Sequence, residues 1–271
     1  MDYTIVIIIS LLAGALTLVT GFGLGTVLLP VFAIFFPAPV AVAATAIVHL
    51  VNNLSKLALV GKWVELPVVI RFGIPATLAA IVGALLLDLV GALPTLTTYS
   101  VASRTAQITP IALLIGLLVI VFGVLELRDI EKKGYDPKLL PLGGVLSGFF
   151  GGLSGHQGAL RSAFLIRAGL DKQQFVGTAA ACSAMVDIAR LLAYWLGSAL
   201  LISTTGSGFG ALNDTWGLVT AACVAGFLGA FVGKRFVKKI RLETIRLLVG
   251  ITLITIGVLM ATGITTVLQP Q

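Results

Sequence analysis

The stretch Gly144-Val-Leu-Ser-Gly-Phe-Phe-Gly-Gly-Leu-Ser-Gly155 lies inside a long apolar segment, residues 139–168. Glycine permits the tight turn and the close helix approach that a broken or re-entrant membrane hairpin needs. The part before the glycine pair, 139–150, would extend only about 18 Å as a helix, too short for a hydrocarbon core of about 30 Å. This segment is therefore predicted to break inside the membrane and to turn back.

A similar stretch occurs near the start of the chain, Gly14-Ala-Leu-Thr-Leu-Val-Thr-Gly-Phe-Gly-Leu-Gly25. With an offset of 130 residues, three of its glycines coincide with those of the first stretch: Gly14 with Gly144, Gly21 with Gly151 and Gly25 with Gly155. Further along, Ala-Thr-Ala at 44–46 matches Gly-Thr-Ala at 177–179. The shared order and spacing predict an internal duplication, which is typical of secondary transporters with a substrate site between the repeats.

The composition is that of a chain surrounded by lipid. Hydrophobic residues make up 58% of the sequence and charged residues 11%, against roughly 25% charged residues in a soluble domain. Apolar segments long enough to cross a bilayer run at about 4–36, 39–60, 69–93, 104–127, 139–168, 173–202, 214–233 and 246–267. We therefore predict an all-α polytopic membrane protein without a separate soluble domain.

The basic residues predict the topology. The net charge of +7 could suggest a nucleic-acid partner, but in a membrane protein basic residues mark cytoplasmic loops, so no nucleic acid is expected. The linker 128–138 and the loop 234–246 are both strongly basic, whereas the loops near 94–103 and 203–213 carry no Lys or Arg. Both basic segments face the cytoplasm only if 4–36 and 139–168 are re-entrant. The prediction is two inverted repeats, 1–127 and 139–271, each a broken hairpin plus three transmembrane helices, with both termini outside.

The glycine-rich openings of both halves resemble the sulfite exporter TauE/SafE family of membrane permeases. The matching residues are Gly21-Phe-Gly-Leu-Gly25 with Pro30, 41–46 (Ala-Val-Ala-Ala-Thr-Ala), Gly151-Gly-Leu-Ser-Gly155 and Gly177-Thr178. The resemblance implies a multi-pass transporter of the bacterial cytoplasmic membrane for sulfite, sulfonates or similar organic anions, coupled to a proton or sodium ion. Gly155-His-Gln-Gly-Ala-Leu-Arg161 departs from the family pattern, which typically continues through further glycines to a proline.

Polar residues inside the apolar segments are candidates for the substrate site, because a charge at membrane depth costs at least about 2.5–3.5 kcal/mol. Helical spacing places a polar stripe on 173–202 and a similar one, which includes Lys56, on 39–60. The duplication would bring the stripes together with the glycine breaks between them. The predicted substrate-binding residues are Arg161, His156, Gln157, Arg190, Asp187, Asn52, Asn53, His49, Ser183, Tyr194, Gly23, Gly25 and Gly155.

This set suits a small anion. Two buried arginines and one aspartate leave surplus positive charge, and a guanidinium matches the oxygens of a sulfonate or carboxylate. His156 could carry a proton, since an imidazole titrates near pH 6.5. The alternative is structural: Asp187 and Arg190 form an ion pair, the histidines are packing groups, and Lys56 extends to the cytoplasmic surface. Cys182 and Cys223 offer no metal spacing and are interpreted as packing residues, so neither metal nor cofactor is expected.

Two other functions fit parts of the sequence. An anion channel can be built from the same hairpins, although buried arginines balanced by an aspartate favour a binding site over a fast pore. Gly152-Leu-Ser-Gly155 fits the motif of rhomboid-type intramembrane serine proteases, but no histidine follows His156 to activate the serine. The chain also has no phosphate-binding loop that could use ATP. An enzyme is therefore not expected, and the oligomeric state is open.

Overall fold

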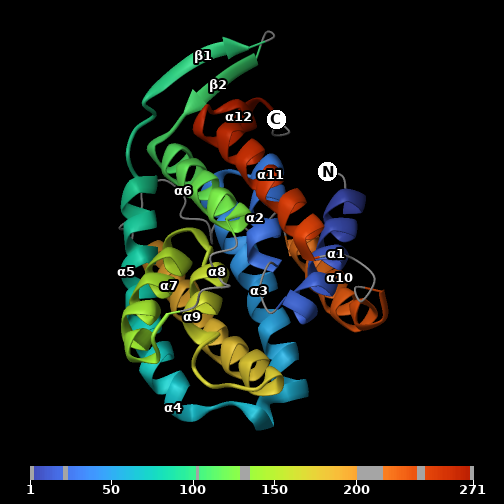
Figure 1. Ribbon diagram of the computed structural model, residues 1–271. Coiled ribbons are helices and arrows are strands. Elements are labelled where there is room, and N and C mark those ends of the chain that lie inside the picture. The colour runs from blue at the N-terminus through green and yellow to red at the C-terminus, as the bar shows by residue number, and fades with distance from the viewer. Residues whose placement is uncertain are drawn as a thin grey trace.

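The computed structural model describes residues 3–20, 24–101, 104–128, 135–199, 216–236 and 242–268. The described part is helical except for one β-hairpin (Figure 1). The first half contains α1 (Tyr3–Thr20), α2 (Leu24–Phe35), α3 (Ala38–Val60), α4 (Leu66–Val68), α5 (Ile74–Gly91), β1 (Thr97–Val101), β2 (Arg104–Ile108) and α6 (Pro110–Leu127). The second half contains α7 (Leu140–Ser154), α8 (Gly158–Leu165), α9 (Lys172–Ala199), α10 (Trp216–Phe236), α11 (Leu242–Ala261) and α12 (Ile264–Leu268).

Four helical segments among the described residues are long and apolar enough to cross a membrane: Ala38–Trp63, Leu66–Gly91, Pro110–Leu127 and Lys172–Gly197. The Leu66–Gly91 segment joins α4 to α5 through a π-helical turn, Val69–Gly73. Large hydrophobic side chains such as Leu78, Val82 and Leu89 on α5 are exposed, as expected for surfaces that face lipid. These properties support the prediction of a polytopic membrane protein.

The second glycine-rich segment is divided into two helices, as predicted, whereas the predicted break of the first, at 21–23, lies outside the described residues. Segment 4–36 forms α1 and α2, and segment 139–168 forms α7 and α8. The position of the second break differs from the prediction, because α7 continues through the Gly151-Gly152 pair as far as Ser154. Gly155 ends it in the left-handed conformation, with φ +79°. The glycine pair stays helical because α7 packs closely against α5.

The predicted segment 104–127 is wrong at its start. Residues 104–108 form β2, which pairs antiparallel with β1 and places Tyr99 opposite Ala106. Helix α6 begins only at Pro110, where the Thr109 side chain accepts a hydrogen bond from the backbone N–H of Ala112. The all-α prediction therefore missed one hairpin. Figure 1 shows it at the same end of the molecule as α12, with α4 at the opposite end; we name these the hairpin end and the α4 end.

Glycines set the closest helix contacts. Along α7, Gly144, Gly148 and Gly152 lie against the backbone carbonyls of Phe72, Ala76 and Ala80 on the α5 segment. A Cβ atom added at Gly148 would lie only 1.9 Å from the Ala76 oxygen, so no larger residue fits there without movement. Small residues at four-residue spacing permit such backbone approach in membrane helices. The α7 glycines therefore serve packing as well as the hairpin.

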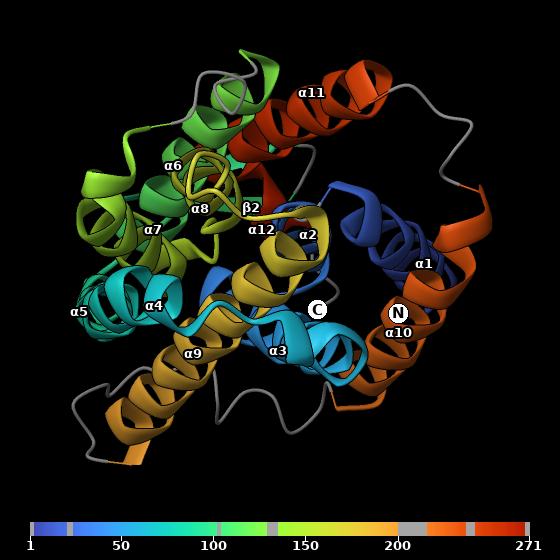
Figure 2. The ribbon, with the colours of Figure 1, turned by 60° about the horizontal axis from the view of Figure 1, so that its bottom comes forward.

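The contact between α1 and α10 has the same geometry as that between α7 and α5. On α7 and α5, Gly152 lies against the Ala80 carbonyl, and Gly83 lies against the Phe149 carbonyl. On α1 and α10, Gly14 lies against the Gly226 carbonyl, and Gly229 against the Leu11 carbonyl. In each case the second contact is three residues further along one helix and three residues back on the other. Helices α3 and α9 pack on each other between these two pairs (Figure 2).

Candidate functional site

A buried polar cluster lies where α3 and α9 meet the break between α7 and α8. Asp187 of α9 is its centre and has no exposed surface. Its Oδ2 accepts a hydrogen bond from Asn53 Nδ2 at 3.1 Å and lies 2.7 Å from His49 Nδ1, both on α3. Its Oδ1 accepts from Gln157 Nε2 at 3.1 Å and from Arg190 at 2.8 Å. One carboxylate thus joins the first half, the second hairpin and its own helix.

Arg190 fixes the hairpin to α9. Besides its ion pair with Asp187, its guanidinium donates a hydrogen bond to the carbonyl of Gly151 at 3.0 Å. A Cβ atom at Gly155 would lie 2.9 Å from the same guanidinium nitrogen. Glycine suits position 155 because of its positive φ, and a larger residue there would also have to displace the Arg190 guanidinium. One turn further along α9, the Tyr194 hydroxyl donates to the carbonyl of Gly152.

Arg161 and Lys56 form the second, more cationic part of the cluster. Arg161 lies on α8 with only 2% of its surface exposed, and its guanidinium donates a hydrogen bond to the hydroxyl of Ser183 on α9. Lys56, at 6% exposure, is also buried and lies close enough to Arg161 and Asp187 for their charges to interact. The alternative that Lys56 extends to the surface is therefore not what the structure shows.

The structure brings together most of the residues that the stripes predicted. His49, Asn53, Gln157, Asp187 and Arg190 are linked by hydrogen bonds, as are Arg161 and Ser183. The predicted structural pairing of Asp187 with Arg190 is also present. Asn52 is buried on the same helix as Asn53, and Gly25 lies in the first turn of α2. Gly23 lies outside the described residues.

His156 lies to one side of the carboxylate cluster. Its ring stacks on that of Phe122 from α6, with 5.1 Å between ring centroids and 10° between planes. Its Nδ1 is 3.1 Å from the carbonyl oxygen of Ser154. Its Nε2 is buried without a hydrogen-bond partner among the described residues. His156 thus connects the hairpin to α6, a contact that helical spacing could not predict because it joins distant segments.

The prediction missed several polar residues inside the apolar segments, among them the half-buried Asp88 and the buried Ser147. Asp88 lies within the apolar segment 69–93, and its Oδ2 is buried without a hydrogen-bond partner in the described part of the chain. It lies at the contact between α5 and α9, where a Cβ atom added at Gly197 would lie 1.9 Å from its Oδ2. Asp88 could have been predicted, because a single carboxylate inside an apolar segment is costly and indicates a functional or structural role. Ser147, whose hydroxyl donates to the Gln157 carbonyl at 3.0 Å, carried no such signal because serine is common in membrane helices.

The chemistry of the cluster is that of binding. It contains several cations and hydrogen-bond donors around one carboxylate, whereas no group of three or more His, Cys, Asp or Glu side chains that could hold a metal occurs among the described residues. Ser154, the serine of the protease-like motif Gly152-Leu-Ser-Gly155, donates its hydroxyl hydrogen to the carbonyl of Phe150 within its own helix. The arrangement can hold an anion by charge and hydrogen bonds.

Comparison with known proteins agrees with this chemistry. No curated protein and no solved structure matches the chain. A family model described as "Sulfite exporter TauE/SafE" matches residues 6–260, which covers both halves and nearly the whole length. The chain therefore belongs to the sulfite exporter TauE/SafE family, whose members are membrane transporters of sulfite- and sulfonate-type anions and not enzymes.

Proposed function

We propose that this protein is a secondary transporter that carries a small anion, such as sulfite, a sulfonate or a related organic acid, across the bacterial cytoplasmic membrane, coupled to a proton or sodium ion. One observation carries the proposal: among the described residues, Lys56, Arg161 and Arg190 are buried around the carboxylate of Asp187. Charges held inside a membrane protein call for compensation. An anionic substrate would add negative charge beside the three cations that the described part of the chain brings to this cluster.

The cationic groups have different tasks in this proposal. Arg190 donates to Asp187 and to the Gly151 carbonyl, so it holds the hairpin in place. Arg161 lies on the short helix that follows the hairpin break, and a guanidinium has five N–H donors, enough to bind Ser183 and an anion together. Arg161 and Lys56 are therefore the groups assigned to the substrate. His49, Asn53 and Gln157 are held in position through Asp187, and His156, Asn52 and Tyr194 would complete the walls of the site.

Burial of the cluster supports a carrier over a channel. Asp187 and Arg190 have no exposed surface, and Arg161 has 2%. A substrate can reach this site only if helices or the hairpin move, which is the requirement of alternating access. A channel would instead need a continuous path through the same region.

The repeated helix contacts support two repeats related by inversion. The pairs α1–α10 and α7–α5 have the same reciprocal glycine geometry. This geometry relates Gly14 to Gly152 rather than to Gly144, which lies eight residues earlier on α7. An odd number of crossings in each half would invert the second half relative to the first.

The distribution of basic residues supports a cytoplasmic α4 end. Lys62 lies beside α4, and the Arg71 guanidinium lies 3.4 Å from the Pro137 carbonyl, which places the start of α7 there as well. The start of α9, with Lys172, is held nearby through a hydrogen bond from Gln174 to Glu65. Basic residues concentrate on the cytoplasmic side of bacterial membrane proteins. The parts of the linker and of the 234–246 loop at 129–134 and 237–241 lie outside the described residues.

The function can be tested with purified protein in liposomes. Uptake of labelled sulfite, methanesulfonate and acetate is measured against concentration, with and without an imposed proton or sodium gradient. The proposal expects saturable uptake, acceleration by unlabelled anion on the opposite side, and stimulation by one gradient. Flux that rises linearly without saturation and shows no counterflow would instead identify an anion channel.

A further inference from the structure

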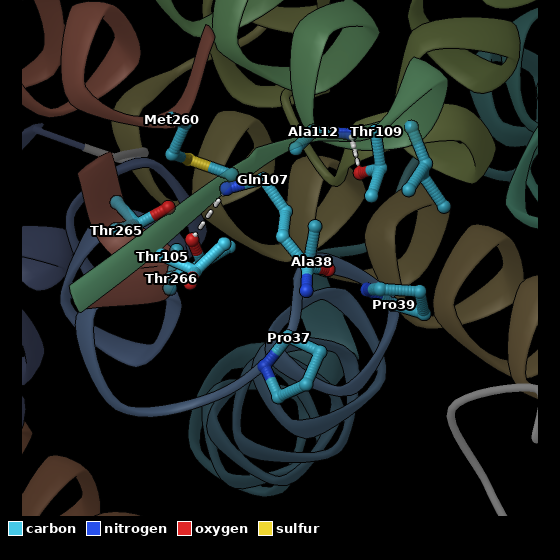
Figure 3. Close-up of a pocket in the computed structure, with 12 residues that line it drawn as sticks. Pro37, Ala38, Pro39, Thr105, Gln107, Thr109, Ala112, Met260, Thr265 and Thr266 are labelled. Carbon is cyan, nitrogen blue, oxygen red and sulfur yellow. Dashed lines mark hydrogen bonds between the residues drawn. The ribbon is translucent and has the colours of Figure 1, made fainter. Parts of the chain in front are cut away.

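A cavity separate from the buried cluster opens near the hairpin end (Figure 3). Its volume is about 430 Å³, and it lies between β2, the starts of α3 and α6, and α12. The side chains that line it are rich in hydroxyl and amide groups: Thr105, Gln107, Thr109, Thr265 and Thr266. None of these residues belongs to the cluster around Asp187, and none was predicted as a site residue.

One of these hydroxyl groups lacks a protein partner. Thr265 is 96% buried, with 4% of its surface exposed, yet its hydroxyl forms no hydrogen bond within the described part of the chain. Figure 3 shows Thr265 beside β2, and it is one of the residues that line the cavity. The neighbouring Thr266 differs, because its hydroxyl donates to the Gly263 carbonyl and accepts from Gln107 N–H. Because Thr265 lines the cavity, its hydroxyl is available to bind water or a ligand there.

The backbone adds a favourable potential for negative charge. The first residues of α3 and α6, helices of 23 and 18 residues, both line the cavity. Each helix N-terminus carries about half a positive charge, and its first N–H groups have no partner within the helix. Pro39 has no N–H, so the donors in the first turn of α3 are those of Ala38 and Val40. At α6, Pro110 has no N–H and the Ala112 N–H donates to the Thr109 hydroxyl, so Ile111 supplies the remaining donor of the first turn. The starts of two helices and the Thr265 hydroxyl therefore meet at one cavity.

Position along α3 connects this cavity to the buried cluster. Eleven residues separate Ala38 at the cavity from His49 at the cluster, which is about 16 Å along a helix. Most side chains between them, such as Val42 and Ala46, are buried and apolar. The polar exception, Thr45, donates its hydroxyl hydrogen to the Ala41 carbonyl of its own helix. The two polar regions are thus on the same helix and are separated by an apolar barrier.

We infer that the cavity is a second anion-binding site, an outer vestibule that holds a small sulfonate- or sulfite-like oxyanion before it passes to the buried cluster. This inference rests on the proposed function. Donor groups come from Thr265 and from the starts of α3 and α6, and Thr105 lies at the exposed rim. The donors of this site are uncharged, which favours weak binding. Weak binding allows an anion to leave the site again on its way through the protein.

The test uses a cysteine at the rim of the cavity. In a protein without its native cysteines (Cys182→Ala, Cys223→Ala), Thr105→Cys is labelled with an anionic methanethiosulfonate reagent, and the rate is measured with increasing methanesulfonate. Binding in the vestibule should slow labelling. Adding Thr265→Val, which removes only the hydroxyl, should raise the methanesulfonate concentration needed for half protection by about ten-fold. The matched control is Thr262→Val, because the Thr262 hydroxyl bonds to the Val258 carbonyl of its own helix.

A third variant separates this inference from the proposed function. Arg161→Lys impairs the buried cluster, and methanesulfonate should still protect the thiol introduced at position 105. Loss of protection in Arg161→Lys, or equal protection in Thr265→Val and Thr262→Val, would show that the cavity has no site of its own. Absence of protection in the parent, although methanesulfonate is transported, would also overturn the vestibule while leaving the proposed function intact. If methanesulfonate, sulfite and acetate are neither bound nor transported, the proposed function is wrong, and the inference of a second site is wrong with it.

Discussion

Arg161 and Asp187 occupy the same buried cluster but differ in their chemistry. Both oxygens of Asp187 are occupied by groups from α3, from the hairpin and from its own helix. A carboxylate surrounded in this way holds a structure together. Arg161 is a permanent cation on α8, beside the hairpin break, and its planar fork can bind two oxygens of an anion. The two residues should therefore respond differently to substitution.

Arg161→Lys should weaken anion binding more than folding. Lysine keeps the charge but loses the planar fork that matches two oxygens of an anion. Losing one charge-assisted contact of about 1.5–3 kcal/mol corresponds to an affinity roughly ten- to hundred-fold lower. Anion-induced thermal stabilisation of the purified protein measures this. Arg71→Lys, at an exposed arginine of the α4 end, is the control, and unchanged affinity in Arg161→Lys would remove Arg161 from the site.

Asp187→Asn should reduce stability together with transport. Removing one partner of a buried ion pair leaves Arg190 without its counter-charge, which typically costs about 3–5 kcal/mol. The variant is expected to show a lower melting temperature even without an anion. Asp171→Asn is the matched control, because Asp171 is exposed and accepts hydrogen bonds from the Gln173 and Gln174 N–H groups that asparagine can also accept. A stable Asp187→Asn protein with impaired transport would place Asp187 in the substrate site instead.

At the scale of elements, backbone contact between α5 and α7 depends on glycine. Gly148→Ala should destabilise the protein by about 1–3 kcal/mol, because the added Cβ would lie 1.9 Å from the Ala76 carbonyl oxygen. Gly61→Ala is the matched control, since a Cβ there meets nothing within 4 Å and its φ of −61° suits any residue. Thermal unfolding of both variants in detergent gives the comparison. Equal melting temperatures would show that α7 can move away from α5 without loss.

At the scale of the whole molecule, the two ends should face opposite sides of the membrane. Ser100 of the hairpin and Asp136 of the linker are both exposed and can each be replaced by cysteine in the background without native cysteines. An impermeant reagent should label Ser100→Cys in intact cells, and Asp136→Cys only after the membrane is opened. Labelling of both from outside, or of Asp136→Cys alone, contradicts the inverted-hairpin topology.

The sequence by itself determined the class of the molecule, the break in the second glycine-rich segment and the family. The composition and the length of the apolar segments are set by the hydrocarbon core, and the glycine runs are set by close helix packing. Each of these is a property of a short stretch of chain, so it can be recognised in the sequence. Helical spacing also placed His49, Asn53, Asp187 and Arg190 on inward-facing stripes, which the structure joins by hydrogen bonds. A charge inside an apolar segment can be satisfied only by partners inside the protein, and this constraint made the cluster predictable.

Only the tertiary structure decided which partners those charges take. The partners of Asp187 come from segments up to 138 residues away in the chain, and nothing local distinguishes them from other polar pairs. The same holds for the stacking of His156 on Phe122 and for the continuation of α7 through Gly151 and Gly152, which α5 stabilises by contact. The β1–β2 hairpin and the threonine-lined cavity likewise arise where α3, α6 and α12 converge. Packing between distant segments depends on the whole fold, and it cannot be predicted from the periodicity of residues along one segment.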